Sequence, residues 1–302
     1  MPFFSRKLMT ETKYSIRKAT PLLPVGDLLE VSYENAVFDV SYPAFGPNTY
    51  IRNLTEMQKT YFHSLERPSI SFREPTTSES ILAAVCDFGN VVKPQILDPR
   101  WLQLGRIIKT PKGIYANPPK DEKGDVLIDE YVLNTFRDKA KKVNGIYLGD
   151  NGFGFAPYET FNQEVREFDE FVEGGLARLL EHTEGRAENL GKMFKFYSRG
   201  VNVFGFDKVD EPIVRVASLE SYGGCDGDML TVGGHYSSDD GDDGFAFGVS
   251  SGTGEASAKK ILSAKKQIKN SELYSPRQIS SALKLLKING LEDQILKALR
   301  KD

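Results

Sequence analysis

The feature that most constrains the fold is an amphipathic stretch at residues 157–181, PYETFNQEVREFDEFVEGGLARLLE. Its apolar residues recur at steps of three and four, the spacing that lines up one stripe of a helix. They are Phe161, Val165, Phe168, Phe171, Val172, Leu176, Leu179 and Leu180. Because such a stripe has to be buried, we expect a central helix on which the core is organised. Gly174 and Gly175 interrupt it, and at these positions another backbone can approach closely.

Strand-like runs lie on both sides of this stretch. Residues 28–33 and 36–42 alternate apolar and polar side chains, which predicts a hairpin. Asn151-Gly152 lies between two further apolar runs, and this dipeptide favours a tight hairpin turn. The last part of the body contains only short strand-like runs, which predict an antiparallel meander. These runs are 201–206, 213–219, 229–232 and 245–249.

Helical patterns lie mainly between the strand-like regions. The clearest start signal is Thr76-Thr77-Ser78-Glu79, a capping box in which a hydroxyl and a carboxylate satisfy the first free N–H groups. Besides the central stretch, helices are predicted at 49–65, 80–88, 129–143 and 187–197. We therefore predict an α+β fold, in which an antiparallel sheet or meander packs against a central amphipathic helix layer, with a small C-terminal helical tail.

Charge divides the chain into a body and a tail. Residues 256–302 contain 11 Lys and Arg against 4 Asp and Glu, a charge of +7, which leaves −10 for residues 1–255 because the whole chain carries −3. We predict a basic, poorly ordered N-terminal segment at 1–26 and an α+β body at 27–250. A polar junction that runs into a helix is predicted at 251–274, and a basic helical hairpin at 275–302.

Composition narrows the class of protein. The 40% apolar and 27% charged residues are typical of a soluble globular chain. Two cysteines are too few for a disulfide framework and fit a reducing compartment. We find no apolar run near the length of roughly 18 residues that spans a bilayer. The sequence therefore predicts a cytoplasmic protein with no membrane partner.

The densest acidic cluster is a candidate metal site. Six aspartates fall in two predicted loops of the meander, and carboxylate oxygens are the ligands that Ca²⁺ or Mg²⁺ prefers. They are Asp226, Asp228, Asp239, Asp240, Asp242 and Asp243. The EF-hand pattern fails at Gly241 and Ser250, so a site here would be irregular. Solvated Asp-Gly turns are the alternative interpretation of the same residues.

The basic tail predicts an acidic partner. Its lysines give the electrostatic footprint of nucleic-acid binding, although Tyr274 is the only aromatic residue there for stacking. The candidate contact residues are Lys259, Lys260, Lys265, Lys266, Lys269, Lys284 and Lys287. Two alternatives remain open. The lysines can serve solubility, or the tail can dock on the acidic face of the 157–181 helix.

Other candidate chemistry has ordinary explanations in the sequence. Gly248-Val249-Ser250-Ser251-Gly252 matches the G-x-S-x-G pattern of a nucleophile elbow, but the histidine that this chemistry requires after the serine is missing. We therefore interpret it as a polar turn. His182 and His235 titrate near neutral pH and can act as acid or base. Since spacing identifies no partner for either, we interpret both as structural.

These observations favour a non-catalytic binding or scaffolding protein with an acidic body and a basic tail, and a protein is the favoured partner. One alternative is a divalent-metal-dependent hydrolase that uses the aspartate loops. A second alternative is nucleic-acid binding through the tail. No catalytic residue is assigned.

Overall fold

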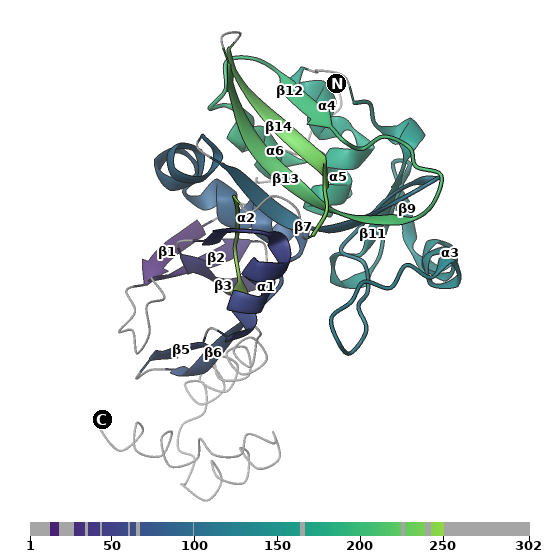
Figure 1. Ribbon diagram of the computed structural model, residues 1–302. Coiled ribbons are helices and arrows are strands. Elements are labelled where there is room, and N and C mark those ends of the chain that lie inside the picture. The colour runs from purple at the N-terminus through teal and green to yellow at the C-terminus, as the bar shows by residue number, and fades with distance from the viewer. Residues whose placement is uncertain are drawn as a thin grey trace, which may run out of the picture. The chain divides into compact units, whose positions relative to one another are not determined.

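The computed structural model describes residues 13–17, 27–33, 36–42, 44–59, 61–64, 67–98, 100–163, 167–224, 227–238 and 243–250. The chain divides into two compact units, Met1–Ser251 and Gly252–Asp302. The second unit, which contains every tail lysine named above, lies outside the described residues. The fold below is that of the first unit, shown in Figure 1.

One sheet of the first unit is built mainly from the start of the chain. Its described strands are, in spatial order, β1 (Lys13–Arg17), β2 (Asp27–Tyr33), β3 (Ala36–Tyr42), β16 (Val249–Ser250), β6 (Arg67–Arg73) and β5 (Tyr61–Ser64). The β2–β3 register runs from Asp27 opposite Tyr42 to Tyr33 opposite Ala36, which confirms the predicted hairpin. Strand β16 joins the sheet between β3 and β6 and so ties the end of the unit to its beginning.

A second, larger sheet holds the middle of the chain. Its described path is β12 (Val201–Phe204), β14 (Gly227–Tyr236), β13 (Ile213–Gly224), β7 (Trp101–Thr110), β8 (Gly113–Ala116), β11 (Gly154–Pro157), β10 (Ile146–Leu148) and β9 (Lys141–Val143). Strand β15 (Gly244–Ala246) pairs with β7 and with β4 (Phe45–Asn48). The predicted meander is wrong in part, because β12 runs parallel to β14 and β15 parallel to β7.

Helices connect and cover these sheets. They are α1 (Tyr50–Lys59), α2 (Thr77–Cys86), the π-helical segment η1 (Phe88–Leu97), α3 (Glu130–Lys139), α4 (Phe168–Glu173), α5 (Gly175–Glu181) and α6 (Glu188–Phe194), with short 3₁₀ turns η2 (Asp150–Gly152) and η3 (Tyr158–Thr160). The capping box of α2 is confirmed, since Thr76 and Glu79 exchange both hydrogen bonds. Two predicted helices are too long: α1 gives way to β5 and α3 to β9.

The continuous central helix predicted at 157–181 is wrong. The chain forms η3, Phe161 and Glu167 are extended, and α4 begins only at Phe168. Gly174 is extended between α4 and α5, with φ −71° and ψ 156°. At Gly175 a Cβ would lie 2.5 Å from the Cβ of Thr160, so the missing side chain makes room for the Thr160 side chain, whereas the sequence predicted the approach of another backbone. Leu176, Leu179 and Leu180 are nevertheless fully buried, as the apolar stripe requires.

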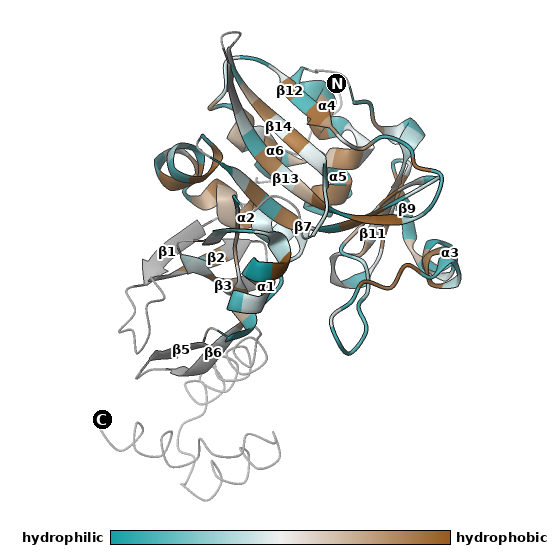
Figure 2. Ribbon diagram, in the orientation of Figure 1, coloured by the Kyte–Doolittle hydropathy of each residue, from teal (hydrophilic) through white to brown (hydrophobic). Residues whose placement is uncertain are grey.

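The main hydrophobic core lies between the two sheets and the layer of α2, α4, α5, α6 and η1. In the view of Figure 1, α5 and α6 lie behind β13 and β14, and Figure 2 shows hydrophobic and hydrophilic residues alternating along these strands. Two smaller cores fill the other face of the larger sheet, one beneath α1 and one beneath α3. Between them, the outer face of β12, β14 and β13 carries no helix in the described part of the chain.

No helix among the described residues is long and apolar enough to cross a membrane.

Candidate functional site

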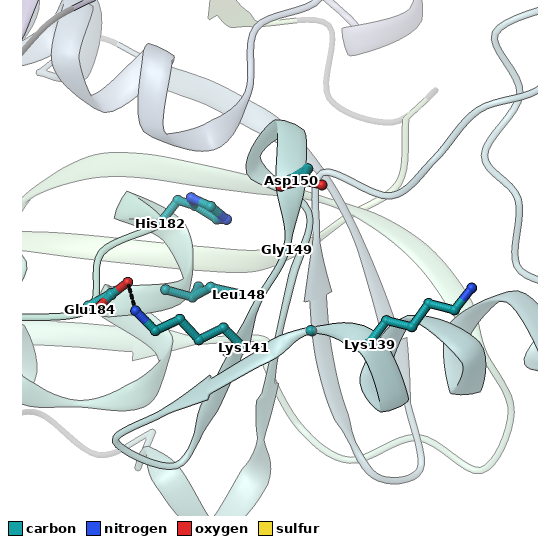
Figure 3. A pocket seen from close by; sticks show the side chains of 8 residues that line it. Lys139, Lys141, Leu148, Gly149, Asp150, His182 and Glu184 are labelled. Atoms are coloured by element: carbon teal, nitrogen blue, oxygen red, sulfur yellow. Dashed lines mark hydrogen bonds and ion pairs between the residues drawn. The ribbon is translucent and has the colours of Figure 1, made fainter.

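A polar pocket opens where the end of α5 meets the β9–β10 hairpin and the turn η2 (Figure 3). Its volume is about 420 Å³, within the range of roughly 300–1,000 Å³ that small-molecule sites occupy. The lining residues come from α3, β9, β10, η2 and the turn after α5: Lys139, Ala140, Lys141, Leu148, Gly149, Asp150, His182 and Glu184. We refer to this cavity as the His182 pocket.

His182 occupies an unusual backbone position at the rim of α5. It adopts the left-handed conformation, with φ 50° and ψ 49°, and its N–H donates to the carbonyls of Arg178 and Leu179. The N–H of Thr183 also reaches the Arg178 carbonyl, at 3.0 Å, so the turn ends α5 in the manner of a Schellman motif. This position usually favours glycine, and a side chain there carries backbone strain.

The His182 imidazole has an unused nitrogen. Partial burial lowers the pKa of His182, whereas hydrogen bonding to the carbonyls of Phe153 and Gly149 and the charge of Asp150 act in the opposite direction. Its Nε2 is buried and has no hydrogen-bond partner among the described residues. A neutral ring with its proton on Nδ1 would keep Nε2 as an acceptor, and this nitrogen is closed off from solvent.

Charges of both signs surround this ring. Lys139 and Lys141 supply two cations, and Asp150 and Glu184 supply two anions. Lys141 Nζ lies 2.5 Å from Glu184 Oε1, but both side chains are more than half exposed, at 64% and 57%. Exposed pairs of this kind contribute about 0–1 kcal/mol, so a ligand can replace either partner at little cost. In Figure 3 Lys139 points away from the other labelled side chains.

A second cluster of polar atoms lies on the helix-free face of the larger sheet, around Gly233 of β14. Ser218 Oγ donates to Glu220 Oε1 at 3.2 Å. A Cβ placed on Gly233 would lie 3.2 Å from Glu220 Oε1 and 3.5 Å from His235 Nδ1, and would clash with Ser218 Oγ. Three polar atoms therefore crowd the position that a Cβ on Gly233 would occupy. We call this set of converging groups the Gly233 notch.

An irregularity in β14 shapes this face. The pairing shifts from Ser218 opposite Gly233 to Val216 opposite Tyr236, so β14 has one residue more than β13 over this span. Neighbouring residues of a regular strand point to opposite faces, whereas such a bulge re-aims a side chain. The rings of His235 and Tyr236 consequently lie close together, with centroids 3.8 Å apart.

These two rings belong to a longer aromatic row. Tyr236 stacks on Trp101 at 4.0 Å, and His235 meets Phe204 edge to face at 4.9 Å. Phe204 forms the open end of the row, with 54% of its surface exposed. Trp101, Tyr236, His235 and Phe204 thus make an aromatic wall beside the Gly233 notch.

The titratable groups of the notch are shifted from their ordinary values. Burial raises the pKa of Glu220, opposed by its hydrogen bond with Ser218, and no described residue forms an ion pair with this carboxylate. Burial and then the charge of Lys109 lower the pKa of His235, whose Nδ1 has no partner in the described structure. Burial and the Glu220 charge raise the pKa of Tyr236. Clusters of shifted groups are typical of functional sites.

A third charged cluster, centred on Glu74, is fully paired. Glu74 accepts hydrogen bonds from Tyr50 at 3.0 Å and from Arg106 at 3.0 and 2.6 Å, and it also pairs with Lys120. Only 10% of the Glu74 side chain and 8% of the Arg106 side chain are exposed. Since every oxygen of Glu74 is engaged, we interpret this cluster as structural.

The residues of the predicted metal site are not brought together in the described structure. Asp228 pairs with Lys93 at 2.7 Å, and Asp243 pairs with Arg100. The two loops leave opposite ends of β14, and the other four aspartates lie outside the described residues. Within the described ranges, no group of three His, Cys, Asp or Glu side chains could hold a metal ion. The metal site therefore stays a prediction.

The remaining candidates are placed as follows. Ser250 of the G-x-S-x-G stretch lies in β16 opposite Phe72 and not in the predicted turn. Both histidines that the sequence singled out lie in the clusters described above. Ser218, Glu220 and Gly233 were missed. Only the alternation of polar residues along β13 could have indicated the first two.

Comparison of the chain with protein-family models, with curated proteins and with solved structures finds no match.

Proposed function

We propose that this chain is a non-catalytic binding protein that holds a small zwitterionic molecule of the amino-acid type in the His182 pocket. The observation that carries the proposal is a cavity of about 420 Å³ that is lined by His182, two lysines and two carboxylates.

The charges of the pocket favour a zwitterion over a simple anion or cation. Two lysines and two carboxylates line it, so the pocket is balanced when His182 is neutral. A simple anion would meet Asp150 and Glu184, and a simple cation would meet the lysines. A ligand with both charged groups can instead replace the weak Lys141–Glu184 pair: its carboxylate pairs with Lys141 and its ammonium group pairs with Glu184.

Titration with the free amino acids one at a time, followed by calorimetry and by the ¹⁵N signals of the His182 ring, tests the proposal. We expect at least one amino acid to bind and to shift the Nε2 signal, and we expect its N-acetyl and its amide derivatives to bind more weakly. Asparagine tolerates the left-handed conformation, so His182→Asn removes the imidazole while keeping the backbone turn.

Matched variants sharpen the experiment. Lys141→Gln is expected to weaken binding, whereas Lys123→Gln, an exposed lysine that does not line the pocket, is expected to leave it unchanged. The proposal fails if no amino acid binds, if blocking either charged group has no effect, or if His182→Asn binds as tightly as the natural chain.

The earlier alternatives keep their own tests. Calorimetric titration with Ca²⁺ and Mg²⁺ addresses the aspartate loops, and salt-dependent retention of the full chain on nucleic acid addresses the tail lysines.

A further inference from the structure

The two carboxylates of the His182 pocket stand on turns that the fold anchors. Asp150 begins the turn η2, and Asn117 Nδ2 holds the other end of this turn through a hydrogen bond of 2.8 Å to the Gly152 carbonyl. Glu184 lies in the turn after α5, where Asn144 Nδ2 donates to the Glu184 carbonyl at 2.9 Å. The spacing between the two carboxylates is therefore set by the fold, and a ligand has to match it.

The charges that face a ligand in this pocket are not balanced. Lys141 pairs with Glu184, whereas Lys139 points away from the other labelled side chains in Figure 3. Asp150 is exposed and forms no ion pair with any described residue. Burial lowers the pKa of His182, so its ring is neutral at neutral pH and does not balance this carboxylate. A zwitterion that replaces the Lys141–Glu184 pair leaves one negative charge, at Asp150.

An uncharged stretch separates this pair from Asp150. Lys141 lies opposite Leu148 in the β9–β10 hairpin, and Asp150 follows Leu148 by two residues. At the usual rise of a strand, two residues span roughly 7 Å. Leu148 and Gly149 occupy the interval, and Figure 3 shows both between the pair and Asp150. A ligand that reaches both places therefore needs an apolar chain between its charged groups.

We propose that the ligand of the His182 pocket is a basic amino acid, with a second cationic group at the end of an aliphatic side chain, and this inference rests on the function proposed above. The α-carboxylate pairs with Lys141, and the α-ammonium group pairs with Glu184. The methylene groups of the ligand lie over Leu148, and its terminal cation pairs with Asp150. The ligand thus supplies one partner for each of the three charges that face it.

A comparison of L-lysine with L-norleucine tests this inference, because norleucine has the same carbon chain and lacks the terminal ammonium group. We would titrate the full chain with each amino acid by calorimetry at neutral pH and low ionic strength, where exposed charges are screened least. Lysine is expected to bind about fivefold more tightly than norleucine, which is the upper end of what an exposed ion pair contributes. L-glutamate is expected to bind more weakly than norleucine, because its side chain would meet Asp150.

Two variants locate the source of this preference. Asp150→Asn removes the charge and keeps the shape of the side chain, so the ratio of lysine to norleucine affinity is expected to fall close to one. Asp210→Asn is the matched control, since Asp210 is also exposed and does not line the pocket, and it is expected to keep the ratio of the natural chain. Substitutions at exposed positions of this kind seldom impair folding.

The outcomes separate this inference from the function on which it rests. Equal binding of lysine and norleucine would overturn the basic ligand and leave an amino-acid site in place. A preference for lysine that survives Asp150→Asn would overturn it as well, because the general negative charge of the body would then explain the preference. Absence of binding by every free amino acid would overturn the proposed function and this inference together.

Discussion

Glu74 and Glu220 are two glutamates in the same folded unit, but Glu74 is paired with cations and Glu220 is not. Glu74 accepts from Tyr50 and Arg106 and pairs with Lys120. Burial alone would raise the pKa of Glu74, but the bonds and charges of Arg106 and Lys120 lower it overall. Glu220 has the hydroxyl of Ser218 as its described donor, and burial raises its pKa.

This difference separates groups that hold the fold from groups that are available to a ligand. A carboxylate whose oxygens are fully engaged has nothing left to offer, and its loss strands a buried cation. A carboxylate that is buried without a counter-ion costs stability, and a binding partner recovers that cost. By this criterion the Glu74 cluster is structural, and Glu220 belongs with the two histidines that have an unused ring nitrogen.

The largest expected effect is that of Glu74→Gln. This change leaves Arg106, which is 8% exposed, without a charged partner, and we expect a loss of about 3–5 kcal/mol in the free energy of unfolding. Glu220→Gln strands no cation and is expected to change that free energy by less than about 1 kcal/mol. Urea denaturation of both variants measures the contrast. Similar losses would show that the two glutamates do not differ as proposed.

The next effect concerns the space beside Glu220. Gly233→Ala would place a methyl group against Ser218 Oγ and within 3.2 Å of Glu220 Oε1, and such overpacking costs about 1–3 kcal/mol. Gly185→Ala is the matched control, because a Cβ there meets nothing within 4 Å. We expect the control to be neutral or slightly stabilising in thermal unfolding. If Gly233→Ala were equally harmless, the notch would be open space and not a set of converging groups.

The sequence predicted features whose partners are close in the chain better than features that depend on distant partners. The capping box at Thr76 and the hairpin at 28–42 follow from local spacing, because their partners are close in the chain. The Gly233 notch depends on a one-residue bulge in the pairing of β13 with β14, which no local pattern specifies. The break between α4 and α5 has a local cause in Gly174 and Gly175, but these glycines do not explain why the chain is not helical before Phe168.

A smaller effect is expected in the pH dependence of stability. The folded pKa of Glu74 is lowered, so its stabilisation is present above the ordinary carboxyl pKa and is lost as the pH falls through the folded value. The folded pKa of Glu220 is raised, so the native state loses stability as the pH rises from the ordinary carboxyl pKa through the folded value. Relative to the natural chain, Glu220→Gln should therefore gain stability with rising pH, and Glu74→Gln should lose it.

Denaturation midpoints of the three proteins across the acidic range measure these slopes. A Glu220→Gln curve that runs parallel to that of the natural chain would mean that the carboxylate is already compensated in the folded state.

The smallest effect on stability is expected at His182, where the comparison between paired and unpaired groups makes its sharpest prediction. His182→Gly removes an imidazole whose Nε2 has no described partner and relieves the strain of a left-handed backbone with φ 50°. Glycine also raises the entropy of the unfolded chain, so the two contributions oppose each other and the net change should stay within roughly 1 kcal/mol. Amino-acid binding should nevertheless be lost, because the pocket loses the imidazole that lines it.

Thermal unfolding and calorimetric titration of the same His182→Gly sample test both halves of this prediction. His182→Asn, which tolerates the same backbone conformation, should behave alike in both measurements. A large loss of stability would show that His182, like Glu74, stabilises the fold. That conclusion would hold whether or not binding is also lost. Retained stability together with lost binding would instead show that the chain keeps a strained side chain at this position for its ligand.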